Sequence, residues 1–204
     1  MEWPKTPLTG DEAMSRIELL PEFLSPIAEA AKLIVRKGAW IDVNSGAFLA
    51  GYRLEMGIIH AHDVVIFPPL LRSQLYVYEK VNSVSLPEKF IEVLGYLNGC
   101  NMMDLQIYGA PVSMAQDPPM LDRSRRAPLD ISSGRHWRTG YAQANDGDLL
   151  FASKNVGDEG QIGYFISPKG RIVGRGNGSP NVHPQSGPWD NVTDWLASEI
   201  GQVR

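Results

Sequence analysis

Apolar residues in the amino-terminal part recur at helical intervals and predict two helices. Thr9-Gly10-Asp11-Glu12 has the spacing of a capping box. Ser25-Pro26 is a second start signal, with serine expected as the cap and proline at the first helical position. Lys37-Gly38 closes the second helix. The apolar stripes of the two helices comprise Ala13, Ile17 and Leu20, then Ile27, Ala31, Ile34 and Val35.

Residues 39–67 show a different pattern, with short apolar runs broken by Asn44-Ser45-Gly46 and by Gly57. This pattern is typical of short strands joined by tight turns. Pro68-Pro69 follows, and two consecutive prolines favour an extended connection over a sheet ladder. We therefore predict an amino-terminal extension over residues 1–67 and a second domain over residues 68–204.

The second part predicts two more helices, several strands and a last helix. One helix carries Leu71, Leu75 and Tyr78, and its partner begins at Leu86-Pro87 and ends at Asn98-Gly99. Strands are expected over residues 103–108, 137–142 and 149–152, and a hairpin over residues 162–175 around Ser167-Pro168-Lys169-Gly170. The last helix presents Val192, Trp195, Leu196, Ile200 and Val203.

Helices thus bracket a run of strands that are joined by turns and not by crossover helices. This order predicts an α+β fold, with a mainly antiparallel sheet wrapped by helices.

Composition supports a globular chain, with 43% apolar and 21% charged residues. Cys100 is the only cysteine, which excludes an internal disulfide and favours a reducing compartment. The first residues do not have the pattern of a signal peptide, and no apolar run reaches membrane-span length. We therefore expect a soluble cytoplasmic protein. The formal charge of −4 argues against a general nucleic-acid binder.

One local stretch is basic in spite of this balance. It contains Arg123, Arg125, Arg126, Arg135 and Arg138, opposed only by Asp122 and Asp130. Such a stretch is either a solvated loop or a surface for an acidic partner.

Candidate catalytic and metal motifs are weak. His60 and His62 alternate along a predicted strand, but no spacing selects further ligands for a metal, and exposed strand histidines are the favoured interpretation. The glycines from Gly174 to Gly178 do not open a helix, so a flexible turn is favoured over a phosphate loop. Gly157-Asp158-Glu159-Gly160 is typical of a hairpin turn, and Cys100 lacks an activating neighbour. We expect no metal and no cofactor.

The segment from Leu70 to Gly99 resembles the signature of the SUKH superfamily, which includes fungal regulators of cell-wall synthesis and bacterial toxin immunity proteins. The resemblance rests on an apolar helix with Glu79, then Leu86-Pro87, Phe90 and Asn98-Gly99. Gly157-Asp158 and Trp195 follow in the order that such proteins present. It covers roughly the last two thirds of the chain. Physically, these residues are expected to be scaffold.

The resemblance implies a non-catalytic protein-binding domain, most plausibly an immunity protein that neutralises a cognate toxin by direct binding. A metal-dependent hydrolase using the His60 and His62 face is one alternative, and a regulatory adaptor of the fungal kind is another. Arginine and aromatic side chains on loops are frequent binding anchors. The predicted partner-binding residues are therefore Arg123, Arg125, Arg126, Arg135 and Trp137. Asp158 and Glu159 are added to them, because their acidic groups are expected to pair with a basic, nuclease-like toxin.

Overall fold

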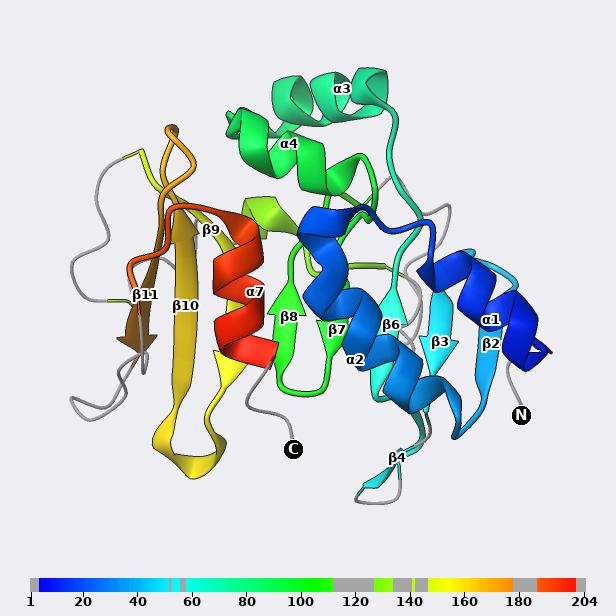
Figure 1. The fold of residues 1–204 in the computed structure, drawn as a ribbon. Helices are drawn as coiled ribbons and strands as arrows, with labels where there is room; N and C mark the ends of the chain where they lie inside the picture. Colours follow the sequence, from blue (N-terminus) through cyan, green and yellow to red (C-terminus); the bar gives the residue numbers. More distant parts are fainter. Residues whose placement is uncertain are drawn as a thin grey trace.

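A nine-stranded antiparallel sheet runs through the whole protein, with helices over one face and at one end (Figure 1). The structure is a computed structural model that describes residues 4–51, 53–55, 58–111, 127–133, 141, 147–177 and 187–200. This architecture confirms the predicted α+β class and its antiparallel sheet.

The strands follow one another across the sheet almost in chain order. The spatial order is β1-β2-β3-β6-β7-β8-β9-β10-β11, while β4 and β5 form a separate two-stranded hairpin. The bounds are β1 Lys5–Pro7, β2 Ala39–Asp42, β3 Phe48–Ala50, β4 Arg53–Glu55, β5 Ile58–Ala61, β6 Val64–Ile66, β7 Cys100–Met102, β8 Leu105–Ile107, β9 Leu149–Asn155, β10 Gln161–Ile166 and β11 Ile172–Asn177.

Three helices lie over one face of the sheet, and two more lie beyond one end of it (Figure 1). The covering helices are α1 Gly10–Ile17, α2 Ser25–Val35 and α7 Val192–Ile200. The end helices, α3 Arg72–Asn82 and α4 Glu88–Leu94, connect β6 to β7. Short 3-10 turns occur at η1 Glu22–Leu24, η3 Ile131–Ser133 and η5 Gly157–Glu159.

Local capping chemistry sets the helix starts. The capping box at Thr9 is confirmed, because the Thr9 backbone N donates to Glu12 Oε2 at 2.8 Å and the Glu12 backbone N donates to Thr9 Oγ1 at 3.3 Å. The prediction of Ser25 as a cap is wrong. The chain is already turning in η1, so Leu24 occupies the cap position and Ser25 is the first residue of α2.

Three further predictions need correction. The strand predicted over residues 103–108 is shorter, β8 Leu105–Ile107, because Met103 takes a positive φ of 51° and turns the chain between β7 and β8. Helix α4 ends at Leu94, with Gly95 as its cap, and not at Asn98-Gly99. The glycine-rich stretch is not a plain turn, since β11 continues to Asn177 paired with β10.

The two faces of the sheet differ in chemistry. Cross-strand pairing aligns one apolar row on the helix-covered face: Ile41, Phe48, Ile66, Cys100, Ile107, Ala152 and Tyr164. The neighbouring row lies on the opposite face, because successive side chains of a strand alternate. That row begins apolar at β3 and β6 and becomes polar from β7 on: Leu49, Val65, Asn101, Gln106 and Ser153.

Aromatic rings connect α4, the sheet and α7. The Phe90 ring meets the Phe151 ring at 5.3 Å, Phe151 meets Trp195 at 4.8 Å, and Trp195 meets Tyr164 at 5.2 Å between ring centroids. The β9–β10 pairing shifts register beside Phe151, which gives β9 one extra residue. This bulge lets Phe151 and the adjacent Ala152 point toward the same helices.

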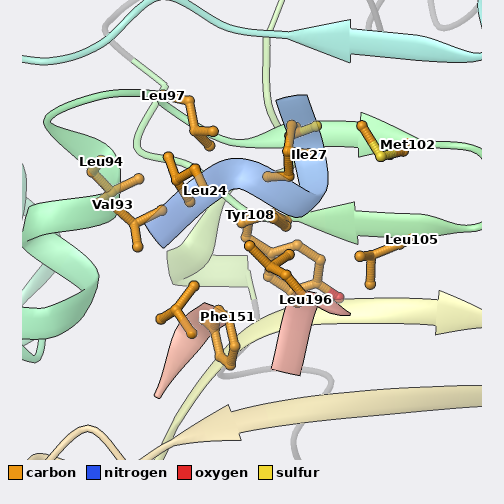
Figure 2. Close-up of a cluster of buried hydrophobic side chains, with 14 of the residues drawn as sticks. Leu24, Ile27, Val93, Leu94, Leu97, Met102, Leu105, Tyr108, Phe151 and Leu196 are labelled. Carbon is orange, nitrogen blue, oxygen red and sulfur yellow. The ribbon is translucent and has the colours of Figure 1, made fainter. Parts of the chain in front are cut away.

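Figure 2 shows the core around these aromatic rings, where aliphatic side chains from helices and strands lie around Phe151 and Tyr108. Leu24 and Ile27 come from η1 and α2, Val93 and Leu94 from α4, and Leu196 from α7.

Polar contacts hold helix α7 to strand β9 and to the turn η1. The Lys154 ammonium on β9 pairs with the buried Glu199 carboxylate at 2.9 Å and also donates to the Glu199 carbonyl at 3.1 Å. Thr193 Oγ1 donates to the Phe23 carbonyl at 3.1 Å, which ties α7 to η1, just before α2.

The sheet continues across the predicted domain boundary after residue 67. Strand β6 pairs with β7 on the other side of Pro68-Pro69, and α2 packs against α7. Within the described residues, no helix has both the length and the apolar content that crossing a membrane requires.

We predict that Phe90→Ala lowers the free energy of unfolding by about 3 to 5 kcal/mol, because it removes a fully buried ring from the aromatic chain. Urea denaturation followed by circular dichroism measures the change. The control is Tyr96→Ala, which removes an aromatic side chain that is 46% exposed from the same region. Equal losses in the two variants would contradict the core role of Phe90.

We also predict that the Cys100 thiol is inert in the folded protein. Burial raises the pKa of this thiol to about 12 from its usual 9.0, so at pH 8 only about one molecule in ten thousand carries the thiolate. Ellman's reagent should label the native protein far more slowly than the urea-unfolded chain, which reacts fully. Because the folded pKa is raised, the associated stability is present below pH 9 and is lost as the pH rises toward 12. Rapid native labelling would contradict this prediction.

Candidate protein-binding surface

Most of the exposed large apolar side chains in the described part of the chain lie on α3 or close to α3 and α4. Of the eight large apolar residues exposed in the described part of the chain, six lie just after α1, on or beside α3, or just after α4. They are Leu19, Leu71, Tyr76, Val77, Val81 and Tyr96. The other two, Leu33 and Val43, lie on α2 and after β2. Clustered exposed apolar groups are typical of interaction surfaces, whereas isolated ones are ordinary.

The outer face of α3 carries half of this cluster. Leu75 and Tyr78 point into the protein and are buried, which turns Tyr76, Val77 and Val81 outward with 56%, 58% and 75% of their surfaces exposed. Lys80 lies on the same side, with its ammonium 4.4 Å from the Tyr76 ring centroid. We call Tyr76, Val77, Lys80 and Val81 the α3 outer face.

Tyr78 fixes which side of α3 faces outward. Its hydroxyl donates to Asp130 Oδ1, and the Ser132 backbone N donates to the Tyr78 hydroxyl at 2.9 Å. Burial, and then the Asp130 hydrogen bond, raise the pKa of Tyr78 far above its usual value. The tyrosine therefore stays protonated and anchors α3 to residues 130–132.

The turn from α3 to α4 is closed by a carboxylate. Glu79 Oε1 accepts a 2.8 Å hydrogen bond from the Leu86 backbone N, and the Glu79 carbonyl accepts from Val84 N at 3.1 Å. Pro87 then caps α4. Arg72 Nη2 bridges both Glu88 carboxylate oxygens at 2.7 and 2.9 Å from the other side. These contacts hold α3 and α4 in a fixed relation.

The segment after α4 is held by Asn98 and two glycines. The Asn98 side chain exchanges two hydrogen bonds with the Ala110 backbone, at 3.0 and 2.8 Å. Gly99 has a φ of 86°, and a Cβ there would lie 2.7 Å from Pro128. A Cβ at Gly109 would collide with the Asn98 backbone oxygen. Only glycines allow this close crossing.

Three hollows adjoin one another and form a trough beside these helices. The first is lined by Asp11, Glu12, Ser15 and Arg16 of α1 and by Leu8 and Leu19 on either side of this helix. The central pocket shares Arg16 and Leu19 with it, and shares Gly95 and Tyr96 with the third hollow. That third hollow lies between α3 and α4 and is lined by Leu70, Arg72, Leu75, Glu88, Lys89, Ile91, Glu92, Gly95 and Tyr96.

The polar face of the sheet holds a separate hydrogen-bond network. Tyr141 donates from its hydroxyl to Gln161 Oε1 at 2.9 Å, and Gln161 Nε2 donates to Ser153 Oγ at 3.2 Å. The Tyr141 ring lies over Gly163, where a Cβ would come within 2.7 Å of it. Burial raises the pKa of Tyr141. This network fixes the position of Tyr141 on β10 and contributes no acid or base that titrates near neutral pH.

The predicted partner-binding residues are only partly described. Asp158 is exposed in η5, the turn between β9 and β10, and Glu159 belongs to the same turn. Gly157 provides the positive φ of 60° at the start of that turn. Arg123, Arg125, Arg126, Arg135 and Trp137 lie outside the described residues. The predicted scaffold residues Leu86, Phe90 and Trp195 are buried.

The histidine motif differs from the expectation of exposed strand residues. His62 is buried, with only 9% of its surface exposed, and its ring meets Trp40 edge-on at 5.6 Å. His60 belongs to β5. In the part of the chain that the structure describes, no three histidine, cysteine or acidic residues gather in a metal-binding arrangement.

Sequence reasoning missed the α3 outer face and the trough. The signal for the first was present, because Tyr76, Val77 and Val81 form a second apolar stripe beside Leu75 and Tyr78. No sequence pattern predicts the trough, because its walls come from segments that are distant in sequence: α1, β3, β6 and the end of α4.

Comparisons with known proteins leave the chain without an assigned family: no family model matches it, nor does any curated protein or any solved structure.

Proposed function

We propose that this chain is a non-catalytic protein-binding domain that docks its partner at the α3–α4 end of the molecule. The observation that carries the proposal is that five exposed apolar side chains lie on or beside α3 or just after α4, and that Leu19 lines the same pocket as one of them, Tyr96. Two of them are tyrosines, a residue type enriched among the energetic anchors of interfaces. Lys80, Arg72 and Glu88 surround them with charge, which is typical of a polar rim.

The rigidity of this surface also favours binding. Before any partner arrives, Tyr78 anchors α3 to residues 130–132 and Glu79 closes the turn between α3 and α4. A preformed surface loses less conformational entropy on association, so more of the contact energy contributes to affinity.

The partner class comes from the resemblance to the SUKH superfamily. We propose a cognate toxin domain, which this chain neutralises by direct binding as an immunity protein. The neighbouring reading frame should then encode a large toxin with a small carboxyl-terminal domain. A neighbouring metabolic operon would contradict the immunity assignment.

The direct test replaces the α3 outer face by Tyr76→Ser, Val77→Ser and Val81→Ser together. Co-purification with that toxin domain, followed by calorimetric titration, should show affinity reduced at least about tenfold, since a few anchors carry most of the energy of an interface. The melting temperature should stay close to that of the parent, because these side chains are exposed.

The matched control is Leu33→Ser with Val43→Ser, which removes the two exposed apolar residues elsewhere in the described chain. It should bind like the parent. A further arm, Asp158→Asn with Glu159→Gln, tests the turn that the sequence suggested. Full binding by the α3 variant together with loss in this arm would place the interface at η5 and refute the proposed surface.

A further inference from the structure

The central pocket of the trough combines an apolar interior with one cation at its rim. Its volume is about 230 Å³. Its walls are Ile17, Leu20, Phe48, Ile66, Phe67, Pro68 and Pro69, with Leu19, Gly46, Gly95 and Tyr96 around them. Among the described residues that line it, Arg16 is the only charged one.

Size favours one side chain as the occupant. Sites for drug-sized molecules measure about 300 to 1,000 Å³, whereas an apolar cavity of about 150 Å³ already accepts benzene. A pocket of this volume therefore accepts one leucine, methionine or phenylalanine side chain.

Hydrogen bonds fix the wall of the pocket that contains Phe67, Pro68 and Pro69. Phe67 N donates to the Gly99 carbonyl at 3.2 Å, and Leu70 N donates to the Leu94 carbonyl at 3.0 Å, on either side of Pro68-Pro69. The prolines have restricted φ and no N–H. Tyr96 is held edge-on by Phe23 at 5.7 Å between ring centroids. The pocket is therefore preformed.

Arg16 supplies the charge preference. The nearest acidic group on its helix, Glu12, already accepts hydrogen bonds from Thr9 N at 2.8 Å and Thr9 Oγ1 at 2.9 Å. Within the described residues Arg16 forms no ion pair shorter than 4.0 Å, and its side chain is exposed. A guanidinium at an apolar rim favours a carboxylate on the occupant.

The hollows on both sides of the pocket indicate a chain segment and not a small molecule. Each shares two lining residues with the pocket, so a polypeptide that anchors one side chain there can continue in both directions. We propose that the pocket anchors one large apolar side chain of an extended segment of a protein partner, and that a carboxylate beside this side chain pairs with Arg16. The inference rests on the proposed protein-binding function and specifies the segment that the partner presents.

The test uses the full chain with ¹³C-methyl and ¹⁵N labels and N-acetyl-L-phenylalanine as the probe. Saturable shifts should appear at Ile17, Leu20 and Ile66, with a Kd on the order of 1 mM. N-acetyl-L-phenylalanine amide, which lacks the carboxylate, should bind about two- to fivefold more weakly. N-acetylglycine, which lacks the ring, should give no saturable shift at these positions.

Two variants check the assignment, with one matched control. Arg16→Gln should weaken the acid about two- to fivefold and leave the amide unchanged. Arg36→Gln removes an exposed arginine at the end of α2 and should change neither affinity. Leu20→Trp fills the pocket and should abolish the shifts; an unchanged methyl spectrum elsewhere verifies its fold.

Several results would overturn the inference. The first is the absence of saturable shifts at about 10 mM probe. The second is equal affinity of the parent and Arg16→Gln for N-acetyl-L-phenylalanine. The third is that hexanoate binds at least as tightly as the probe, which would indicate a small aliphatic acid as the ligand. Because these titrations need no partner, they separate failure of the pocket from failure of toxin capture.

Discussion

Trp195 lies at the centre of the contacts that join the layers of this protein. Its ring meets Phe151 on β9 and Tyr164 on β10, and Phe151 continues the contact to Phe90 on α4. The β-bulge beside Phe151 makes this possible, because it turns Phe151 toward the helices without breaking the alternation elsewhere. The end helices that carry the proposed binding surface thus depend on a core formed by β9, β10 and α7.

Helix α3 carries buried residues of the core on one side and exposed residues of the proposed binding surface on the other. Leu75 and Tyr78 must be buried to hold α3, and Tyr76 and Val77 lie between them in sequence on the other side. A helix with apolar residues on both sides exposes an apolar stripe, and this stripe lowers the solubility of the protein. A partner that covers the stripe would remove this effect. This arrangement is consistent with a helix selected for contact as well as for packing.

Local signals predicted much of the fold, and their limits have physical causes. The capping box at Thr9 and the turn at residues 167–170 depend on neighbours in sequence, so both were predicted correctly. The turn at Met103 was missed because non-glycine residues rarely adopt a positive φ. The Tyr78–Asp130 and Asn98–Ala110 contacts join distant segments, and no local pattern announces them. The trough was unpredictable for the same reason.

Most strands are synthesised shortly before or after the strand they pair with, whereas α7 is synthesised long after α2, the helix it packs against. Most neighbouring strands can pair soon after they leave the ribosome, but α2 packs against α7, which follows it by more than 150 residues. At about 5 to 20 residues per second, that interval lasts on the order of ten to thirty seconds. During translation the side of α2 that packs against α7 is therefore without its final cover until the last part of the chain has been made.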